Sequence, residues 1–219
     1  MSVKVKICGI KTPEALQAAL AARADFVGLN FYPPSPRSLS PDMAAELAEL
    51  ARNRTVIVAL IVDGEDAFID EIVRKVDPDF LQLHGSETPE RATEIARRWG
   101  KPVIKAIKVE TATDAAEALA YADVARFILF DAKAPKDLAG ALPGGNGLAF
   151  DWHLLDGVKD RVPYLLSGGL TPENVGAAIA ATGATMVDVS SGVETGPGIK
   201  SPDLIRRFID AARAVHAPA

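Results

Sequence analysis

The chain is poor in cysteine: Cys8 is the single thiol among its 219 residues. One cysteine excludes an intrachain disulfide and a metal site of clustered thiolates, and it is typical of a reducing compartment. Long apolar runs are also missing, because no stretch approaches the roughly 20 residues that cross a bilayer. The first apolar residues alternate with Lys4 and Lys6, so we expect no signal peptide and a cytoplasmic location.

Positive charge is in deficit as well. The sequence holds 24 Lys and Arg against 29 Asp and Glu, which gives a formal net charge of −5. This balance argues against nucleic acid or an anionic membrane as the partner. A hydrophobic fraction of 48% with 24% charged residues is ordinary for a globular protein. No linker or shift in composition divides the chain, so we expect one domain over residues 1–219.

Strand-like and helix-like segments alternate along the whole chain. Short runs rich in β-branched residues predict strands, and stretches with apolar residues at helical spacing predict helices between them. Five Thr/Ser-Pro dipeptides, each followed by an acid, predict helix starts with the hydroxyl as N-cap; they begin at Thr12, Ser40, Thr88, Thr171 and Ser201. The predicted strands are residues 3–8, 26–32, 55–62, 80–84, 103–109, 126–131, 163–166 and 186–189.

Eight such units predict an α/β fold, a single-domain (β/α)8 TIM barrel with eight parallel strands. A doubly wound open sheet is the competing arrangement. In a barrel the functional residues follow the carboxyl ends of the strands. Those positions hold Cys8, Asn30, Arg37, Asp63, His84, Lys108, Asp131 and residues 167–169 and 190–192.

Two glycine-containing turns follow the seventh and eighth strands. They contain Gly168 and Gly169 in the first, and Ser190, Ser191 and Gly192 in the second. Turns of this kind expose backbone N–H groups and lead into helices, which is where barrels bind phosphate. The alternative is that glycine merely permits a tight turn. We expect a phosphorylated small molecule as substrate.

Cys8 and Asp131 end the first and sixth strands, so a barrel places them on opposite sides of its mouth. A thiolate base and a protonated carboxyl group there suit proton transfer at adjacent atoms of a sugar phosphate, as in an aldose–ketose isomerisation. The alternative for Cys8 is a small buried hydrophobic residue. For Asp131 it is a rim carboxylate paired with Lys133 or Lys136.

The sequence suggests roles for three further residues. Arg37, in the proline-rich loop 33–41, has a planar fork that suits a carboxylate, and its alternative is a solvated loop cation. His84 is interpreted as a structural hydrogen-bonding residue, and Asp188 is expected to orient the last loop. Cys8 needs a nearby cation to ionise, and Lys6 and Lys11 are the nearest in sequence.

Six segments occur in the order typical of one known family: KICGIKTPEAL (6–16), SPRSLSP (35–41), LQLHGSE (81–87), GGNGLAFDW (144–152), LSGGLTPENV (166–175) and DVSSGVETGPGIKS (188–201). Together they resemble the phosphoribosylanthranilate isomerases over essentially the whole chain. Two segments depart from the common pattern, FDAKAPK after the sixth predicted strand and GGNG in place of GGTG. We expect mobility in the loop 132–149, given its Gly and Pro content.

The resemblance implies an Amadori rearrangement of N-(5-phosphoribosyl)anthranilate in tryptophan biosynthesis. It places Cys8 as general base and Asp131 as general acid, and it places Arg37 at the anthranilate carboxylate. Gly169 and residues 190–192 fall in the family's phosphate site. No metal or organic cofactor is expected, because the substrate's own nitrogen is the electron sink. A monomer and a homodimer both stay open.

Two other classes remain as alternatives. The first class is another sugar-phosphate barrel. Indole-3-glycerol phosphate synthase would need catalytic Lys and Glu at strand ends, and ribulose-phosphate epimerase would need a metal site of His and Asp residues. The residues at the predicted strand ends fit neither set well. A barrel that binds a phosphorylated metabolite without turnover is the other class, and it would be favoured by the absence of Cys8 or Asp131.

Overall fold

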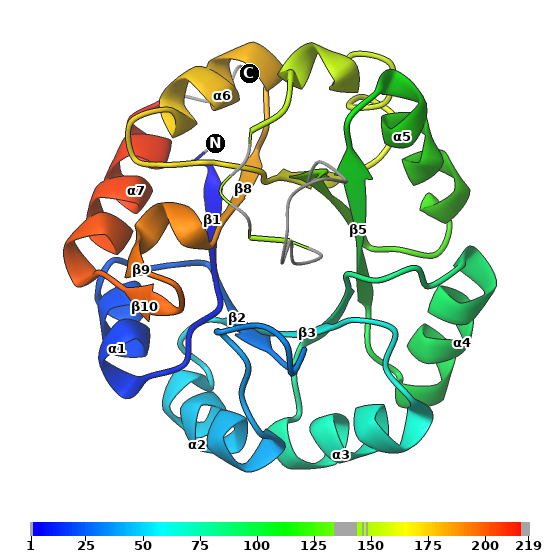
Figure 1. Ribbon diagram of the computed structural model, residues 1–219, viewed down its shortest axis with the longest axis vertical. Coiled ribbons are helices and arrows are strands. Elements are labelled where there is room, and N and C mark those ends of the chain that lie inside the picture. The colour runs from blue at the N-terminus through cyan, green and yellow to red at the C-terminus, as the bar shows by residue number, and fades with distance from the viewer. Residues whose placement is uncertain (1, 134–143, 146, 148, 216–219) are drawn as a thin grey trace.

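Eight parallel strands close into a barrel in the computed structural model, which describes residues 2–133, 144, 145, 147 and 149–215 (Figure 1). Strands adjacent in sequence are paired, and the eighth pairs with the first, where Lys6 lies opposite Asp188. The predicted (β/α)8 barrel is confirmed, and the alternative of an open sheet is wrong. The strands are β1 (Lys4–Cys8), β2 (Phe26–Asn30), β3 (Val56–Ile61), β4 (Phe80–Leu83), β5 (Val103–Val109), β6 (Phe127–Ala132), β7 (Tyr164–Leu166) and β8 (Met186–Val189).

Helices form a ring around the barrel (Figure 1). Two predicted helices are 3-10 helices over part or all of their length. Residues 113–122 form a short α-helix followed by the 3-10 helix η1 (Glu117–Tyr121), and residues 151–155 form only the 3-10 turn η2 (Trp152–Leu155), because i to i+3 bonds tighten both segments. The α-helices are α1 (Pro13–Ala21), α2 (Pro41–Ala51), α3 (Asp66–Val76), α4 (Pro89–Trp99), α5 (Ala112–Ala116), α6 (Val175–Thr182) and α7 (Pro202–Ala214).

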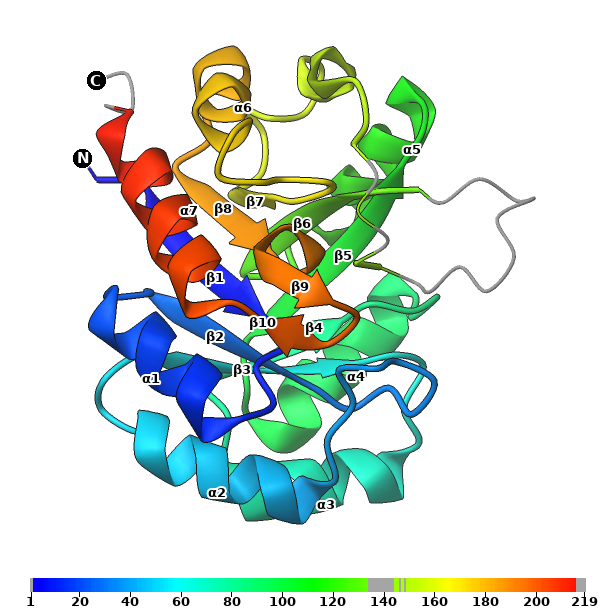
Figure 2. The same cartoon turned by 60° about the vertical axis from the view of Figure 1, so that its left-hand side comes forward.

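A short hairpin after β8 was not expected from the sequence. Its strands β9 (Glu194–Gly196) and β10 (Ile199–Lys200) follow the 3-10 turn η3 (Ser191–Val193) and pair in antiparallel fashion. The segment gives no strand signal because it is only a few residues long and contains Gly and Pro. The hairpin lies beside the carboxyl ends of β1 and β8 (Figure 2).

Alternate residues of each strand face the helices and the barrel interior. In β1, Val5 and Ile7 belong to the large apolar cluster shared with the helices, whereas the fully buried Lys6 belongs to the other face. A separate apolar cluster fills the interior; its members are Phe26, Val58, Ile104, Ala106, Leu129, Leu165 and Met186. The interior is therefore apolar in its deeper layers and becomes polar toward the carboxyl ends of the strands.

Hydroxyl caps begin four of the five helices for which the sequence predicts them. The side chains of Thr12, Ser40, Thr88 and Ser201 accept from the backbone N–H three residues on. The prediction at Thr171 is wrong, because α6 begins later and its N-cap is Asn174. Asn174 Oδ1 instead accepts from Thr171 N at 2.8 Å and Nδ2 donates to Gly169 O at 2.9 Å, so the segment folds into a turn that braces the glycine loop.

No helix in the described part of the chain is long and apolar enough to cross a membrane. The loop 132–149, for which the sequence predicts mobility, lies mostly outside the described residues.

Removing the hydroxyl that caps α4 should lower the stability of the protein. Thr88 Oγ1 accepts from Arg91 N at 3.3 Å, so Thr88→Ala should lower the free energy of unfolding by about 1 kcal/mol in urea titrations. Thr88→Ser keeps the oxygen and should stay close to the unsubstituted protein. Equal losses in both variants would contradict the cap.

Candidate active site

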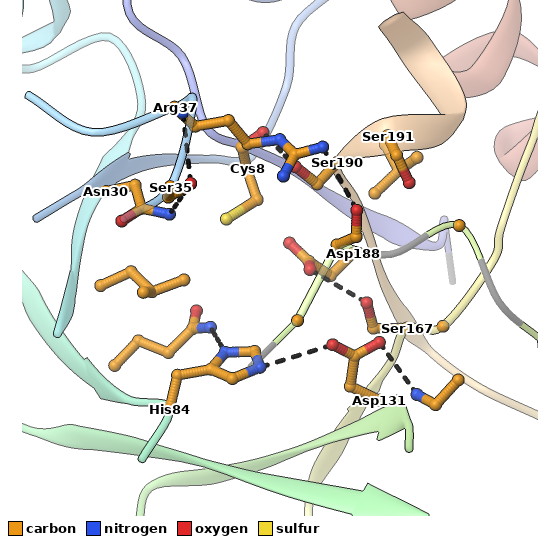
Figure 3. Close-up of a pocket in the computed structure, with 18 of the residues that line it drawn as sticks. Cys8, Asn30, Ser35, Arg37, His84, Asp131, Ser167, Asp188, Ser190 and Ser191 are labelled. Atoms are coloured by element: carbon orange, nitrogen blue, oxygen red, sulfur yellow. Dashed lines mark hydrogen bonds and ion pairs between the residues drawn. The ribbon is translucent and has the colours of Figure 1, made fainter. Parts of the chain in front are cut away.

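One pocket at the carboxyl ends of the strands gathers most of the predicted site residues (Figure 3). Seven of the eight line it: Cys8, Arg37, Asp131, Gly168, Gly169, Ser190 and Ser191. Gly192 does not line the pocket. A Cβ atom at Gly192 would lie 1.9 Å from the carbonyl oxygen of Leu170, so this glycine lets the turns after β7 and β8 pack against each other.

The Cys8 thiol lies at the end of β1 and is almost fully buried. A Cβ atom on the neighbouring Gly28 would lie 2.9 Å from Cys8 Sγ and 3.2 Å from Lys6 Nζ, so the thiol and the ammonium converge above this glycine. Lys6 is therefore the cation beside the thiol. The other candidate, Lys11, donates to Pro36 O at 2.9 Å and serves the loop 33–41.

Opposing effects act on the ionisation of Cys8. Burial raises the pKa of the thiol, Lys6 and Lys200 act to lower it, and Asp188 acts to raise it. Burial disfavours the charged form of Lys6, but Asp188 and Cys8 outweigh it and leave the pKa of Lys6 raised. The ammonium group of Lys6, with its raised pKa, therefore lies beside a thiol whose own pKa is raised by burial.

The sequence suggested that Asp188 orients the last loop, but its side chain bonds elsewhere. Its Oδ1 accepts from Lys6 Nζ at 2.7 Å and its Oδ2 accepts from Ser167 Oγ at 3.1 Å. The side chain points into the barrel and joins β1, β8 and the turn after β7. The expectation failed because Asp188 lies within β8, where its side chain faces the interior of the barrel and not the loop that follows the strand.

Asp131 ends β6 and is 6% exposed. Its Oδ1 accepts from Ala132 N at 2.9 Å, and its Oδ2 lies 3.4 Å from His84 Nε2 (Figure 3). The alternative pairing with Lys133 is wrong, because Lys133 Nζ lies 3.4 Å from Glu110 and 3.3 Å from Asp114. Lys136 lies outside the described residues.

His84 and a glycine surround the Asp131 carboxyl group. His84 Nδ1 lies 2.9 Å from Gln82 Nε2, which leaves Nε2 facing Asp131. A Cβ atom at Gly144 would lie 2.5 Å from His84 Nε2 and 2.6 Å from Asp131 Oδ2. The chain at Gly144 therefore passes directly over the two side chains, a role that the sequence did not assign to it.

Arg37 is 5% exposed, so its interpretation as a solvated loop cation is wrong. Its Nε and Nη2 atoms donate to Glu194 Oε1 and Oε2, both at 2.8 Å, and Nη2 also donates to Gly145 O at 3.2 Å. One edge of the guanidinium group is thus held by the protein's own carboxylate. No local pattern in the sequence indicates this pair, since 157 positions separate the two residues.

The glycine turn after β7 requires its glycines. Gly168 and Gly169 have φ angles of 84° and 60°, in the left-handed region, and a Cβ atom at Gly168 would lie 2.7 Å from Ala132 N. Behind the turn after β8, Lys200 Nζ donates to Ser190 O at 2.9 Å. No group of three or more His, Cys, Asp or Glu within the described ranges could hold a metal ion.

Comparison with known proteins decides the family. The family model described as N-(5'phosphoribosyl)anthranilate (PRA) isomerase matches residues 5–211. The chain belongs to this family. A PRA isomerase of Parvibaculum lavamentivorans is 52% identical over 213 residues, which cover 97% of this chain and 99% of the relative. A PRA isomerase of Rhodopseudomonas palustris strain BisB5 is 54% identical over 214 residues, which cover 98% of this chain and 97% of the relative.

Solved PRA isomerases share the fold at full length. The Thermotoga maritima enzyme superposes with a TM-score of 0.87 at 38% identity, over 97% of this chain and all of that one. A PRA isomerase structure with reduced 1-(o-carboxyphenylamino)-1-deoxyribulose 5-phosphate superposes with a TM-score of 0.84 at 37% identity, over 97% and 100% of the two chains. The activity is therefore that of a PRA isomerase of tryptophan biosynthesis, and the other two sugar-phosphate enzymes are wrong alternatives.

The buried pair of Lys6 and Asp188 should be sensitive to loss of one partner. Lys6→Met leaves the Asp188 carboxylate buried without its cation, which should cost about 3–5 kcal/mol of unfolding free energy in urea titrations. The double variant Lys6→Met with Asp188→Asn removes both charges and should recover most of the loss. A double variant as unstable as the single one would contradict this account.

Proposed function

We propose that Cys8 is the general base and Asp131 the general acid of PRA isomerisation in this enzyme. The observation that carries the proposal is that both side chains line one pocket from β1 and β6, beside the two glycine turns. Protonated Asp131 donates to the furanose ring oxygen as the ring opens to a Schiff base. The Cys8 thiolate then removes the proton from C2, and the enolamine that results tautomerises to the ketone.

Neither step requires a metal or an organic cofactor, because the protonated nitrogen of the Schiff base accepts the electron pair released at C2. The protein then has to supply a proton on one side of the sugar and remove one on the other. A pocket with an acid and a base on separate strands suits that requirement.

In this proposal Lys6 supports the base. A thiolate that forms in a buried site is poorly hydrated and therefore strongly basic, and the adjacent ammonium group of Lys6 offsets its negative charge. Because Lys6 is itself held by Asp188 at 2.7 Å, its charge stays beside Cys8 while the proton moves.

We also propose how the two ends of the substrate are held. Arg37 meets the anthranilate carboxylate through the guanidinium edge that Glu194 leaves free. Backbone N–H groups of Gly168, Gly169 and residues 190–192 receive the phosphate, with Gly192 acting from behind the pocket wall. The relative solved with the reduced product analogue supports a ligand with these two anionic ends.

The remaining assignments concern the whole chain. We infer a single domain over residues 1–219, supported by the family match to residues 5–211 and by the closed barrel. We infer a monomer or a homodimer, since the Thermotoga maritima relative is described as a dimer from which monomers were generated. A cytoplasmic location is supported by the free thiol of Cys8, which suits a reducing compartment.

Replacing the base or the acid should abolish most turnover. Cys8→Ala and Asp131→Asn should each lower kcat by about 10²-fold or more on freshly generated PRA, while circular dichroism shows a folded protein. His153→Ala is the matched control, because this side chain is exposed on η2 and should leave kcat unchanged. Activity that survives in either folded active-site variant would refute the assignment of that residue.

The ionisation of Cys8 can be followed directly, since it is the single thiol in the sequence. Burial raises its pKa in the folded protein, so the rate of iodoacetamide alkylation should rise about tenfold per pH unit from neutral pH to beyond pH 9. The value of kcat/KM should rise with pH over the same interval for the same reason. The control is the protein unfolded in guanidinium chloride, where the rate should level off at the ordinary thiol pKa; a plateau near pH 7 in the folded protein would contradict the proposal.

A further inference from the structure

Glu194 is buried at the start of β9, with a side chain only 4% exposed, and its carboxylate is fully engaged. It accepts from Arg37 Nε and Nη2 and from Lys200 Nζ, each at 2.8 Å, and from Gly198 N at 3.2 Å. A carboxylate has about four acceptor positions, so these donors saturate it. Glu194 therefore has no capacity left for a ligand and acts on the pocket only through its partners.

The first partner is the arginine at the pocket wall. Glu194 holds the Nε–Nη2 edge of Arg37, and Gly145 O accepts a second bond from Nη2 at 3.2 Å. The other terminal nitrogen, Nη1, lies 2.9 Å from the position of a Cβ atom on Gly145. Glu194 thus determines which guanidinium edge an anion in the pocket can meet.

The second partner lies behind the phosphate turn. The Lys200 side chain is 1% exposed, and its Nζ donates to Ser190 O at 2.9 Å and to Ser190 Oγ at 3.3 Å. Ser190 Oγ in turn donates to Cys8 O at 3.2 Å. One carboxylate is therefore connected to the arginine on one side of the pocket and to the turn after β8 on the other.

The charges of this cluster suit a ligand with two anionic ends. Arg37 and Lys200 both bond to the single carboxylate of Glu194, so this buried cluster has two basic groups for one acidic group. Burial lowers the pKa of Lys200, and Glu194 acts to raise it. Burial acts to raise the pKa of Glu194, but Arg37 and Lys200 outweigh it and keep the carboxylate ionised. Without the charge of Glu194, Arg37 and Lys200 would lose their shared counter-ion; Lys200 would keep its bonds to Ser190, whereas Arg37 would lose the carboxylate that holds its Nε–Nη2 edge.

We propose that Glu194 is a positioning residue that fixes Arg37 and the turn after β8 relative to each other, and so selects substrates with a carboxylate at one end and a phosphate at the other. The inference rests on the proposed carboxylate-binding role of Arg37 and on the proposed phosphate site. It does not depend on the roles of Cys8 and Asp131, because binding is measured without turnover.

Calorimetry with two ligands tests this inference. One is reduced 1-(o-carboxyphenylamino)-1-deoxyribulose 5-phosphate, and the other is the same molecule with phenyl in place of carboxyphenyl. Glu194→Gln keeps the shape of the side chain but removes its charge. It should raise Kd for the first ligand by about tenfold or more and raise Kd for the phenyl ligand by less than about threefold.

The controls separate positioning from general damage. Glu173→Gln removes an exposed carboxylate that pairs with Arg207 at 2.8 Å and should change neither Kd. Adding Glu194→Gln to Arg37→Gln should weaken binding of the carboxylate ligand by no more than the roughly threefold allowed for the phenyl ligand, because only the effect transmitted through Lys200 and Ser190 remains. Glu194→Asp keeps the charge one methylene further back, should reduce discrimination in the same direction but less, and serves as the test if Glu194→Gln does not fold.

Three outcomes would overturn the inference. Equal weakening for both ligands would make Glu194 a structural residue only, and an unchanged Kd for the carboxylate ligand would show that Arg37 needs no such partner. If the unsubstituted enzyme binds both ligands alike, the proposed role of Arg37 fails and this inference fails with it. Loss of kcat in Cys8→Ala or Asp131→Asn is a separate result and does not affect these measurements.

Discussion

The ion pair of Lys6 and Asp188 lies inside the barrel, at the point where β8 meets β1 and the ring of strands closes. A single buried charge at this seam would be strongly destabilising, so the two residues require each other. The same pair places a positive charge beside the Cys8 thiol and receives the Ser167 hydroxyl from the turn after β7. Closure of the fold and control of the proposed base therefore depend on one interaction.

The two-residue repeat of a strand distributes the pocket around this pair. Lys6 and Cys8 project from one face of β1, and Asp188 and Ser190 continue the corresponding face of β8. Each inward position toward the carboxyl end is one layer nearer to solvent, so the structural charges lie deeper and the proposed catalytic groups lie above them. Arg37, from the loop 33–41, and Glu194, at the start of β9, then add a second buried ion pair.

The strands, their order and the residues at their ends follow from the sequence because they rest on local signals: apolar runs, helix caps and strand-end positions. Contacts between distant segments do not follow from local signals of this kind. Nothing near Glu194 indicates that it meets Arg37, and the position of Gly144 over Asp131 depends on the path of a loop. Even a local signal fails where the chain offers a competing partner, as at Thr171, where Asn174 takes the capping position.

The close approach of Gly192 to the carbonyl of Leu170 has a consequence for binding energetics. Two turns that pack together at the distance of a missing methyl group have little room to rearrange, so the proposed anion-binding surface is preorganised before a ligand arrives. Little conformational entropy remains to be lost there when the phosphate binds, and more of the interaction free energy is retained as affinity. If the phosphate binds there as proposed, it is held at a rigid surface, and the rest of the substrate is aligned relative to it.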